Sequence, residues 1–187
     1  MMNDSQTLKN LNSPVLLLGP SHSGKSAATT YFLDSGAPTH LFATAQIGKS
    51  ITEERLAELQ KLRPHWKITQ VLRDLSAEIS QATVAKTPVV IDSINQWVAA
   101  EIVLLGDITL VDLPRSFKVM VAELCYLIQA ASCRVIIVSS EVGACPASPN
   151  PTERLFRHAI GYTNQKLASA AQSVVTCNAG ILQVIKS

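Results

Sequence analysis

Residues Gly19–Ser26 read GPSHSGKS and directly follow the apolar run Val15-Leu16-Leu17-Leu18. They fill every fixed position of G-x-x-x-x-G-K-[ST], in which a glycine-rich loop joins a buried strand to a helix and points backbone N–H groups at phosphate oxygens. Lys25 would reach the outer phosphates of a nucleoside triphosphate, and the Ser26 hydroxyl would hold Mg²⁺. The following helix would turn the positive end of its dipole toward the phosphates. The alternative is a chance turn rich in glycine and serine, which leaves the preceding strand without a role.

We therefore expect a nucleotide-binding loop made of Gly19, Pro20, Ser21, His22, Ser23, Gly24, Lys25 and Ser26. Lys25 and Ser26 are its expected catalytic residues, and Ser26 is also an expected metal ligand.

Strand-like and helix-like segments alternate along the rest of the chain. The expected strands are residues 15–19, 40–45, 66–72, 89–92, 134–139, 174–178 and 181–186. The expected helices begin at residue 24, run from 50 or 52 to 63, and cover 74–86, 93–105, 114–131 and 152–171. This alternation predicts an α/β fold with a mostly parallel sheet, helices on both faces, and a C-terminal antiparallel hairpin around Ala179-Gly180.

Length and composition limit the possible classes of protein. The 187 residues suit one domain, which we place at residues 14–187 behind a flexible polar tail of residues 1–13. The charged fraction is 16%, below the usual value of about 25%, so we expect part of the apolar surface to be buried in a homo-oligomer. A net charge of +2 without any basic run argues against nucleic acid as a partner.

No apolar stretch is long enough to span a membrane, and no secretory signal pattern is visible at the start. The four cysteines stand far apart without a C-x-x-C motif. Cys125 and Cys133 are flanked by core-type residues and are expected to be buried thiols. A reduced cytoplasm is the expected compartment.

Asp92 ends the apolar strand 89–92. Proteins with this loop place a carboxylate at such a strand end to orient the hydration shell of Mg²⁺, which would make Asp92 a catalytic and metal-site residue. The alternative is an N-cap for the helix that begins near Ser93. Glu141, after the next core strand, is a weaker candidate of the same kind, with a solvated loop carboxylate as its alternative.

Several segments together resemble one family, the bifunctional adenosylcobinamide kinase / adenosylcobinamide-phosphate guanylyltransferases of cobalamin biosynthesis. Besides the phosphate loop and the strand ending at Asp92, they are A-T-A-Q at 43–46, R-P-x-W at 63–66, S-E-V-G at 140–143 and R-L-F-R-x-x-x-G-x-x-N-Q-x-L-A at 154–168. The resemblance covers nearly the whole chain after Ser13, and the segment 164–168 and Glu141-Val142-Gly143 are its more specific parts.

This resemblance implies a RecA-like P-loop NTPase fold, a homotrimer, and a corrinoid substrate. It implies that ATP or GTP first phosphorylates the hydroxyl of the aminopropanol arm of adenosylcobinamide. GMP from GTP then moves onto that phosphate through a guanylyl-histidine. By resemblance, the nucleotide contacts beyond the loop are Thr44, Ala45, Gln46, Arg63 and Asp92.

The sequence departs from the family at the histidine that carries GMP. That residue lies four positions before the Arg of R-P, where this chain has Leu59 between Glu58 and Gln60. Leucine has no lone pair with which to attack phosphorus, so Leu59 cannot be guanylylated. At about 100° per residue, Ile51, Leu56, Leu59 and Leu62 would form one apolar helix face.

The nearest histidine, His65, lies beyond Pro64 and therefore off the helix. Two further positions differ from the family. The acid that the family shows shortly after the Trp is Gln70 here, and the Asp that usually follows F-R is His158. The loss at Gln70 puts guanine preference in question, and a surface or intersubunit role is the simplest for His158.

Four functions stay open on the sequence alone. The first is a kinase that keeps phosphoryl transfer and has lost guanylyl transfer, and the second is a non-catalytic nucleotide-binding homologue with a regulatory or assembly role. The third is the full bifunctional enzyme with His65 as the nucleophile. The fourth is a kinase that acts on an unrelated small alcohol.

Overall fold

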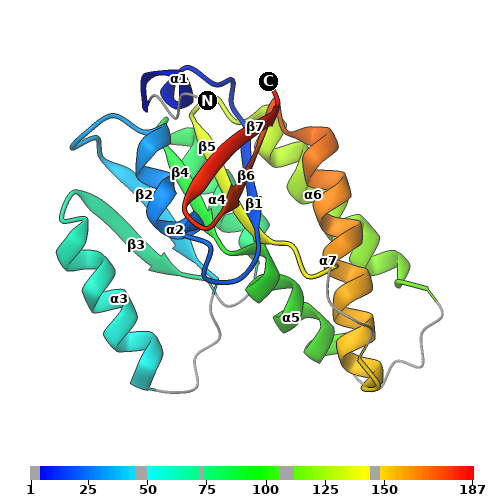
Figure 1. Ribbon diagram of the computed structural model, residues 1–187. Coiled ribbons are helices and arrows are strands. Elements are labelled where there is room, and N and C mark those ends of the chain that lie inside the picture. Colours follow the sequence, from blue (N-terminus) through cyan, green and yellow to red (C-terminus); the bar gives the residue numbers. More distant parts are fainter. Residues whose placement is uncertain (1–4, 45–49, 72–73, 106–111, 144–147) are drawn as a thin grey trace.

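The computed structural model describes residues 5–44, 50–71, 74–105, 112–143 and 148–187. Seven strands of these residues form one sheet in the order β3-β2-β4-β5-β1-β6-β7 (Figure 1). They are β1 (Val15–Gly19), β2 (Thr39–Ala43), β3 (Trp66–Gln70), β4 (Val89–Asp92), β5 (Val135–Ser140), β6 (Ser173–Asn178) and β7 (Ile181–Lys186). All neighbours pair in parallel except β6 and β7, which are antiparallel. The predicted parallel sheet and C-terminal hairpin are confirmed.

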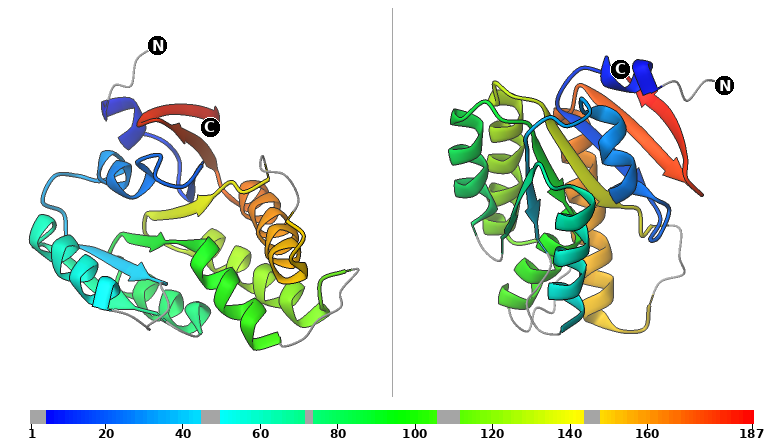
Figure 2. Two further views of the ribbon diagram at one scale, coloured as in Figure 1. Left: turned by 60° about the horizontal axis from the view of Figure 1, so that its bottom comes forward. Right: turned by 90° about the vertical axis from the view of Figure 1, so that its left-hand side faces the viewer.

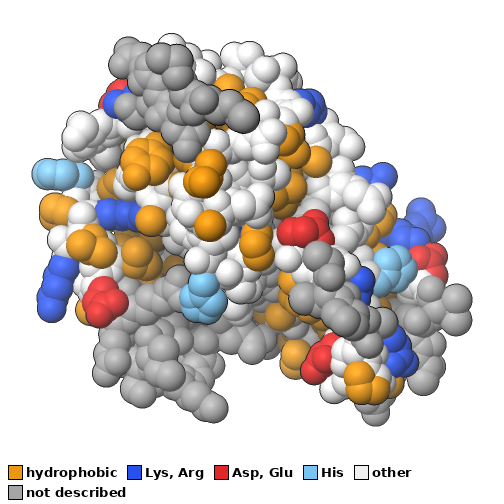
Figure 3. All heavy atoms as spheres, in the orientation of Figure 1, with side chains coloured by type: hydrophobic (Ala, Val, Ile, Leu, Met, Phe, Trp, Pro, Cys, Tyr) orange, Lys and Arg blue, Asp and Glu red, His pale blue; other side chains and the backbone are white. Residues whose placement is uncertain are grey.

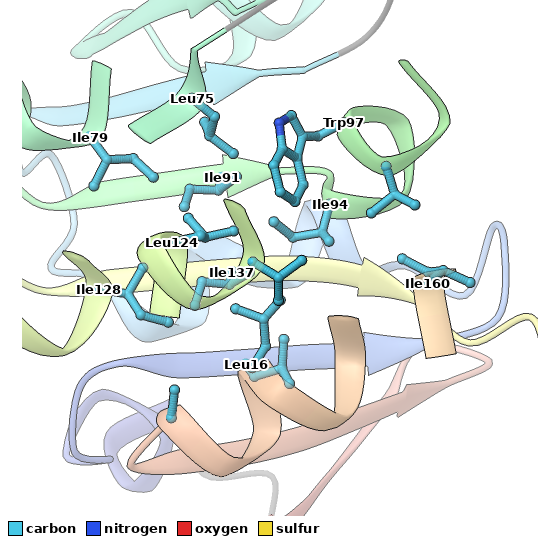
Figure 4. Close-up of a cluster of buried hydrophobic side chains, with 14 of the residues drawn as sticks. Leu16, Leu75, Ile79, Ile91, Ile94, Trp97, Leu124, Ile128, Ile137 and Ile160 are labelled. Atoms are coloured by element: carbon cyan, nitrogen blue, oxygen red, sulfur yellow. The ribbon is translucent and has the colours of Figure 1, made fainter. Parts of the chain in front are cut away.

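Helices cover both faces of the sheet (Figure 2). The helices are α1 (Ser5–Lys9), α2 (Lys25–Ala28), the 3-10 helix η1 (Thr29–Phe32), α3 (Ser50–Leu62), α4 (Leu75–Val84), α5 (Ile94–Leu105), α6 (Arg115–Ala130) and α7 (Pro151–Ala170). One apolar cluster joins the sheet to α4, α5, α6 and α7 (Figure 4). A second, smaller cluster joins the opposite face to the segment of α1, α2 and η1, with Leu59 of α3 packed against it. The central strands are buried on both faces, which explains their continuous apolar sequences.

The N-terminal segment differs from the expected flexible tail. Within residues 5–13 lies α1, and Leu8 and Leu11 are buried in the second apolar cluster. Arg134 fixes the segment by donating from Nη2 to the Leu8 carbonyl at 3.2 Å and from Nη1 to the Leu11 carbonyl at 3.0 Å. Two leucines among polar residues are a weak sequence signal, and Arg134, which holds them, lies more than 120 residues later in the chain, directly before β5.

Two helices show how local sequence sets their ends. Asn150 caps α7 by accepting from the Thr152 N–H at 2.9 Å, and Pro151 occupies the first turn, where no N–H is needed. The helix expected from residue 24 is only one α-helical turn, α2, and continues as η1. The hydroxyls of Thr29 and Thr30 bond to backbone carbonyls three residues earlier, a competition that favours the tighter turn. None of the helices in the described residues is long and apolar enough to cross a membrane.

Candidate functional site

A pocket of about 600 Å³ lies at the carboxyl ends of the central strands, between the phosphate loop, α3 and the start of α5. It is lined by Ser21, His22, Ser23, Gly24, Lys25, Ser26, Ala27, Leu41, Ala43, Leu56, Leu59, Asp92, Ser93, Asn95, Gln96, Val138 and Ser140. Ligands of open α/β sheets bind at this edge. The pocket brings most of the loop residues together with Asp92, as their strand ends predicted.

The phosphate loop is closed by contacts within itself. Gly24 takes a left-handed conformation, with φ of 98°, and the first turn of α2 begins there with the Ala28 N–H bonded to its carbonyl. Lys25 Nζ donates to the Pro20 carbonyl at 2.5 Å and lies 3.4 Å from the Ser23 hydroxyl. Burial lowers the pKa of Lys25, while the negative charge of Asp92 acts in the opposite direction. A desolvated ammonium at the loop interacts strongly with an anion placed there.

Asp92 lies at the end of β4, which β5 separates from β1 and the loop. Ser93, not Asp92, holds the position before α5, since its carbonyl accepts the N–H groups of Gln96 and Trp97. Asp92 lines the pocket instead, together with Ser26. These are the oxygen ligands that Mg²⁺ prefers beside phosphates. No cluster of three or more acidic, His or Cys groups that could hold a metal occurs in the described residues, and a Mg²⁺ site built largely on phosphates and water needs none.

Thr44 follows β2 and holds the neighbouring strand end. Its hydroxyl donates to the Ser93 carbonyl at 2.5 Å and accepts from the Ser93 N–H at 3.0 Å, and its own N–H donates to the Asp92 carbonyl at 3.2 Å. The side chain is buried and does not line the pocket. Thr44 thus acts on the backbone beside Asp92. Ala45 and Gln46, expected to contact nucleotide, lie outside the described residues.

Arg63 follows α3 and reaches the back of the loop. Its Nη2 donates to the Ser26 carbonyl at 2.6 Å, and its guanidinium carbon lies 4.3 Å from the centre of the Trp66 ring. Its Nη1 is buried without a hydrogen-bond partner among the described residues. Burial lowers the pKa of Arg63, and Asp92 opposes that shift. The side chain lines a second pocket of about 450 Å³ beside Tyr31, His65 and Trp66.

Leu59 lines the pocket at the phosphate loop together with Leu56 and packs against the second apolar cluster. The predicted apolar face of α3 therefore exists around these two residues, but Leu62 is 78% exposed because it lies past the edge of that cluster. The Ile51 side chain is not described. His65 is exposed and lines the second pocket, not the one that contains Lys25.

The end of β5 is fixed from α7. The Ser139 hydroxyl donates to Asn164 Oδ1 at 2.6 Å, and Asn164 Nδ2 donates to the Ser140 carbonyl at 3.1 Å, with both side chains buried. Glu141 donates its N–H to the Gly19 carbonyl at 3.0 Å, which links β5 to the loop. Its carboxylate accepts from the Gly143 N–H at 2.6 Å and does not line the pocket. Glu141 here is a loop carboxylate.

Two replaced positions lie away from the loop. Gln70 is the last residue of β3, opposite Ala43 of β2. His158 is exposed on α7 and lines a separate pocket of about 460 Å³ with Arg154 and Arg157.

Sequence reasoning missed several lining residues, notably Ser93, Asn95 and Gln96. Asn95 Oδ1 is buried without a partner among the described residues. The available signal was their place in the turn directly after Asp92. It is a weak one, because first-turn polar residues usually cap their own helix.

Comparison with known proteins identifies a matching family and two similar relatives. Residues 15–185 match the family described as cobinamide kinase / cobinamide phosphate guanyltransferase. The chain is 27% identical over 173 residues to the bifunctional adenosylcobalamin biosynthesis protein CobP of Pseudomonas aeruginosa, covering 91% of this chain and 96% of that one. It is also 27% identical over 179 residues to the bifunctional adenosylcobalamin biosynthesis protein CobU of Salmonella typhimurium, covering 92% of this chain and 99% of that one.

Solved structures agree on the fold. A protein of Pyrococcus horikoshii OT3 superposes with a TM-score of 0.59 at 7% identity, covering 98% of this chain and 92% of that one. An ATPase of a bacterial type III secretion system superposes with a TM-score of 0.52 at 13% identity. That match covers 87% of this chain, which spans only 50% of the ATPase. The fold is the expected P-loop NTPase fold, and the chain belongs to the cobinamide kinase / cobinamide phosphate guanyltransferase family.

Proposed function

We propose that this protein is an adenosylcobinamide kinase that transfers the γ-phosphoryl group of ATP or GTP to the hydroxyl of the aminopropanol arm. The observation that carries the proposal is a single pocket that holds Lys25, Ser26 and Asp92 around an intact phosphate loop. Leu59, which by the sequence resemblance takes the place of the guanylylated histidine of the family, lines the same pocket. Phosphoryl transfer depends on positioning and charge stabilisation, which the loop supplies, whereas guanylyl transfer through the enzyme requires a nucleophile.

In the proposed reaction the acceptor hydroxyl oxygen bonds to the γ-phosphorus while the bond from that phosphorus to the β,γ-bridging oxygen breaks. ADP or GDP leaves, and the hydroxyl proton passes to solvent or to a phosphate oxygen. Lys25 and the loop N–H groups would stabilise charge on the outer phosphates. Ser26 and Asp92 would hold Mg²⁺, which neutralises phosphate charge when bound. The loose transition state makes a strong base for the hydroxyl unnecessary.

The acceptor would approach from the α5 side of the pocket. Ser93, Asn95 and Gln96 line that side and offer hydroxyl and amide groups to a hydroxyl-bearing substrate. The opposite wall carries Leu56 and Leu59 and is apolar. We further propose that Thr44, Ala45, Gln46 and Arg63 complete the nucleotide site, Thr44 through the backbone beside Asp92 and Arg63 through the Ser26 carbonyl.

We also propose a homo-oligomer, in line with the low charge. Figure 3 shows hydrophobic side chains among the polar ones on the face that carries β7. Large exposed apolar residues of the described chain include Val103, Leu104, Val119, Tyr126, Ile181 and Ile185. Light scattering at micromolar concentration tests this proposal, with a mass above the 20.1 kDa of one chain as the expected result.

A non-catalytic nucleotide-binding role is the second candidate, favoured by the loss of the histidine at Leu59.

The test incubates adenosylcobinamide and γ-labelled ATP or GTP with the wild-type protein and, in parallel, with the Lys25→Ala variant. We expect label on the corrinoid with the wild-type chain and at most background with the variant. Nucleotide binding without any labelled corrinoid from either donor would remove the kinase proposal and leave the non-catalytic role.

A further inference from the structure

The turn of the β6–β7 hairpin lies against the back of the phosphate loop (Figure 1). The Ser23 carbonyl accepts two hydrogen bonds from that hairpin. The Gly180 N–H donates at 2.9 Å, and the Cys177 thiol donates at 3.0 Å. Cys177 is fully buried, so its thiol has no water to replace this contact. A carbonyl from one end of the chain is therefore held by two donors more than 150 residues away.

The loop and hairpin approach each other closely at the glycines. A Cβ on Gly19 would lie 2.1 Å from the Cys177 carbonyl oxygen, which no side chain tolerates. A Cβ on Gly24 would lie 3.6 Å from Gly180 Cα and 3.9 Å from the Cys177 sulfur. The absence of a side chain at Gly19 therefore lets the backbone of the loop lie directly on the hairpin, whereas a Cβ at Gly24 would be in ordinary van der Waals contact with it. The loop is supported on the side away from its pocket.

The direction of the Ser23 carbonyl decides what the loop offers to a phosphate. In a trans peptide unit the C=O and the following N–H point in opposite directions. With the Ser23 carbonyl turned into the hairpin, the Gly24 N–H points the other way, to the pocket that both residues line. A peptide flip would exchange that donor for a carbonyl oxygen, which repels phosphate.

We propose that Cys177 is a positioning residue for nucleotide binding. Its thiol, with the Gly180 N–H, holds the Ser23 carbonyl so that the loop keeps its phosphate-binding conformation. Cys177 touches neither nucleotide nor acceptor and acts only through Ser23. This inference rests on the nucleotide binding of the proposed function but is independent of the acceptor and of turnover.

The test measures the dissociation constants of GTP and GMP for the wild type, Cys177→Ala, Cys177→Ser and the control Cys125→Ala. Cys125 is a half-buried thiol that packs against the other apolar cluster. We expect Cys177→Ala to weaken GTP binding about three- to tenfold, the effect of one hydrogen bond, and GMP binding less. Cys177→Ser keeps a donor and should restore GTP binding to within about twofold, and Cys125→Ala should leave it unchanged.

Hydrogen exchange at the Gly180 amide of the wild type supplies a second measurement if Cys177→Ala does not fold. Because coupling between two sites is reciprocal, GTP should slow exchange of this amide. Unchanged GTP affinity in folded Cys177→Ala overturns the inference, as does an equal loss for GTP and GMP. If that variant is unfolded, the inference is overturned when GTP leaves the exchange rate of the Gly180 amide in the wild type unchanged. A wild-type chain that binds GTP but labels no corrinoid contradicts only the proposed kinase, and one that binds no nucleotide contradicts both.

Discussion

Arg63 donates from Nη2 to the carbonyl of Ser26 at 2.6 Å, across 37 residues of sequence. This hydrogen bond joins the end of α3 to the first turn of α2, directly after Lys25. The guanidinium also stacks on Trp66, so one side chain connects the loop, α3 and the start of β3. It ties the C-terminal end of α3, the helix that carries Leu59, to the phosphate loop.

Replacing Arg63 with lysine should weaken this connection. Lysine keeps the charge but lacks the planar fork that bonds Ser26 and stacks on Trp66 at the same time. We expect Arg63→Lys to raise the dissociation constant for GTP or ATP about tenfold, measured by titration with a fluorescent nucleotide. Arg115→Lys, an exposed change at the start of α6, is the matched control. Equal affinity for the wild type and Arg63→Lys would show that the hydrogen bond to Ser26 and the stacking on Trp66 contribute nothing to nucleotide binding.

Removal of either charged group in the pocket should abolish most phosphoryl transfer. Lys25→Met and Asp92→Asn keep approximate side-chain size and remove the charge at the two ends of the proposed phosphate site. Each should lower kcat about 10²- to 10³-fold, the usual effect of one preorganised electrostatic group. Initial rates of corrinoid labelling provide the measurement, with far-ultraviolet circular dichroism to show that the variants fold. A loss below about threefold would place the chemistry elsewhere.

Asn164 should matter for stability as well as for the site. Asn164→Ala leaves the Ser139 hydroxyl without its acceptor and the Ser140 carbonyl without its donor in a buried region. The expected loss in the free energy of unfolding is about 1–3 kcal/mol, measured by urea denaturation. The exposed neighbour Gln165→Ala serves as control and should change it by less than about 0.5 kcal/mol. Equal effects at both positions would show that the buried network contributes nothing.

The sequence predicted β1 and β4 to the residue, because buried parallel strands leave continuous apolar runs that end at polar sites such as Asp92. The positions of Lys25 and Ser26 followed from a local motif. Arg63 came from the family resemblance, and its contact with Ser26 is tertiary. Cys177 was not singled out for function, because the sequence pattern of a cysteine inside a strand indicates a core residue. Its contact with the phosphate loop is tertiary and leaves no sequence signal. The length of α2 was also missed, since the threonine hydroxyls that favour η1 are compatible with either helix type.

His40 predicts how stability depends on pH. Burial lowers the pKa of His40 below its ordinary value of 6.5, with Lys67 adding to the shift and Glu78 opposing it. The folded protein therefore takes up a proton less readily than the unfolded chain. Stability is full above about pH 6.5 and falls as the pH drops through the window between 6.5 and the lower folded pKa.

Urea denaturation from pH 7.5 to 5 measures this effect on the wild type and on His40→Gln, which keeps a polar group near the Thr69 hydroxyl. The wild type should lose more stability than the variant over this range. Parallel pH profiles would show that His40 titrates alike in both states.

The central claim is a site that transfers the γ-phosphoryl group and carries Leu59 where guanylylation would need a histidine. The most direct measurement incubates the wild-type protein with GTP labelled at the γ position or at the α position, with adenosylcobinamide present. We predict γ label on the corrinoid, with α label neither on the corrinoid nor bound covalently to the protein. Covalent α label that disappears in His65→Ala, or α label on the corrinoid, would contradict the account and restore the second activity.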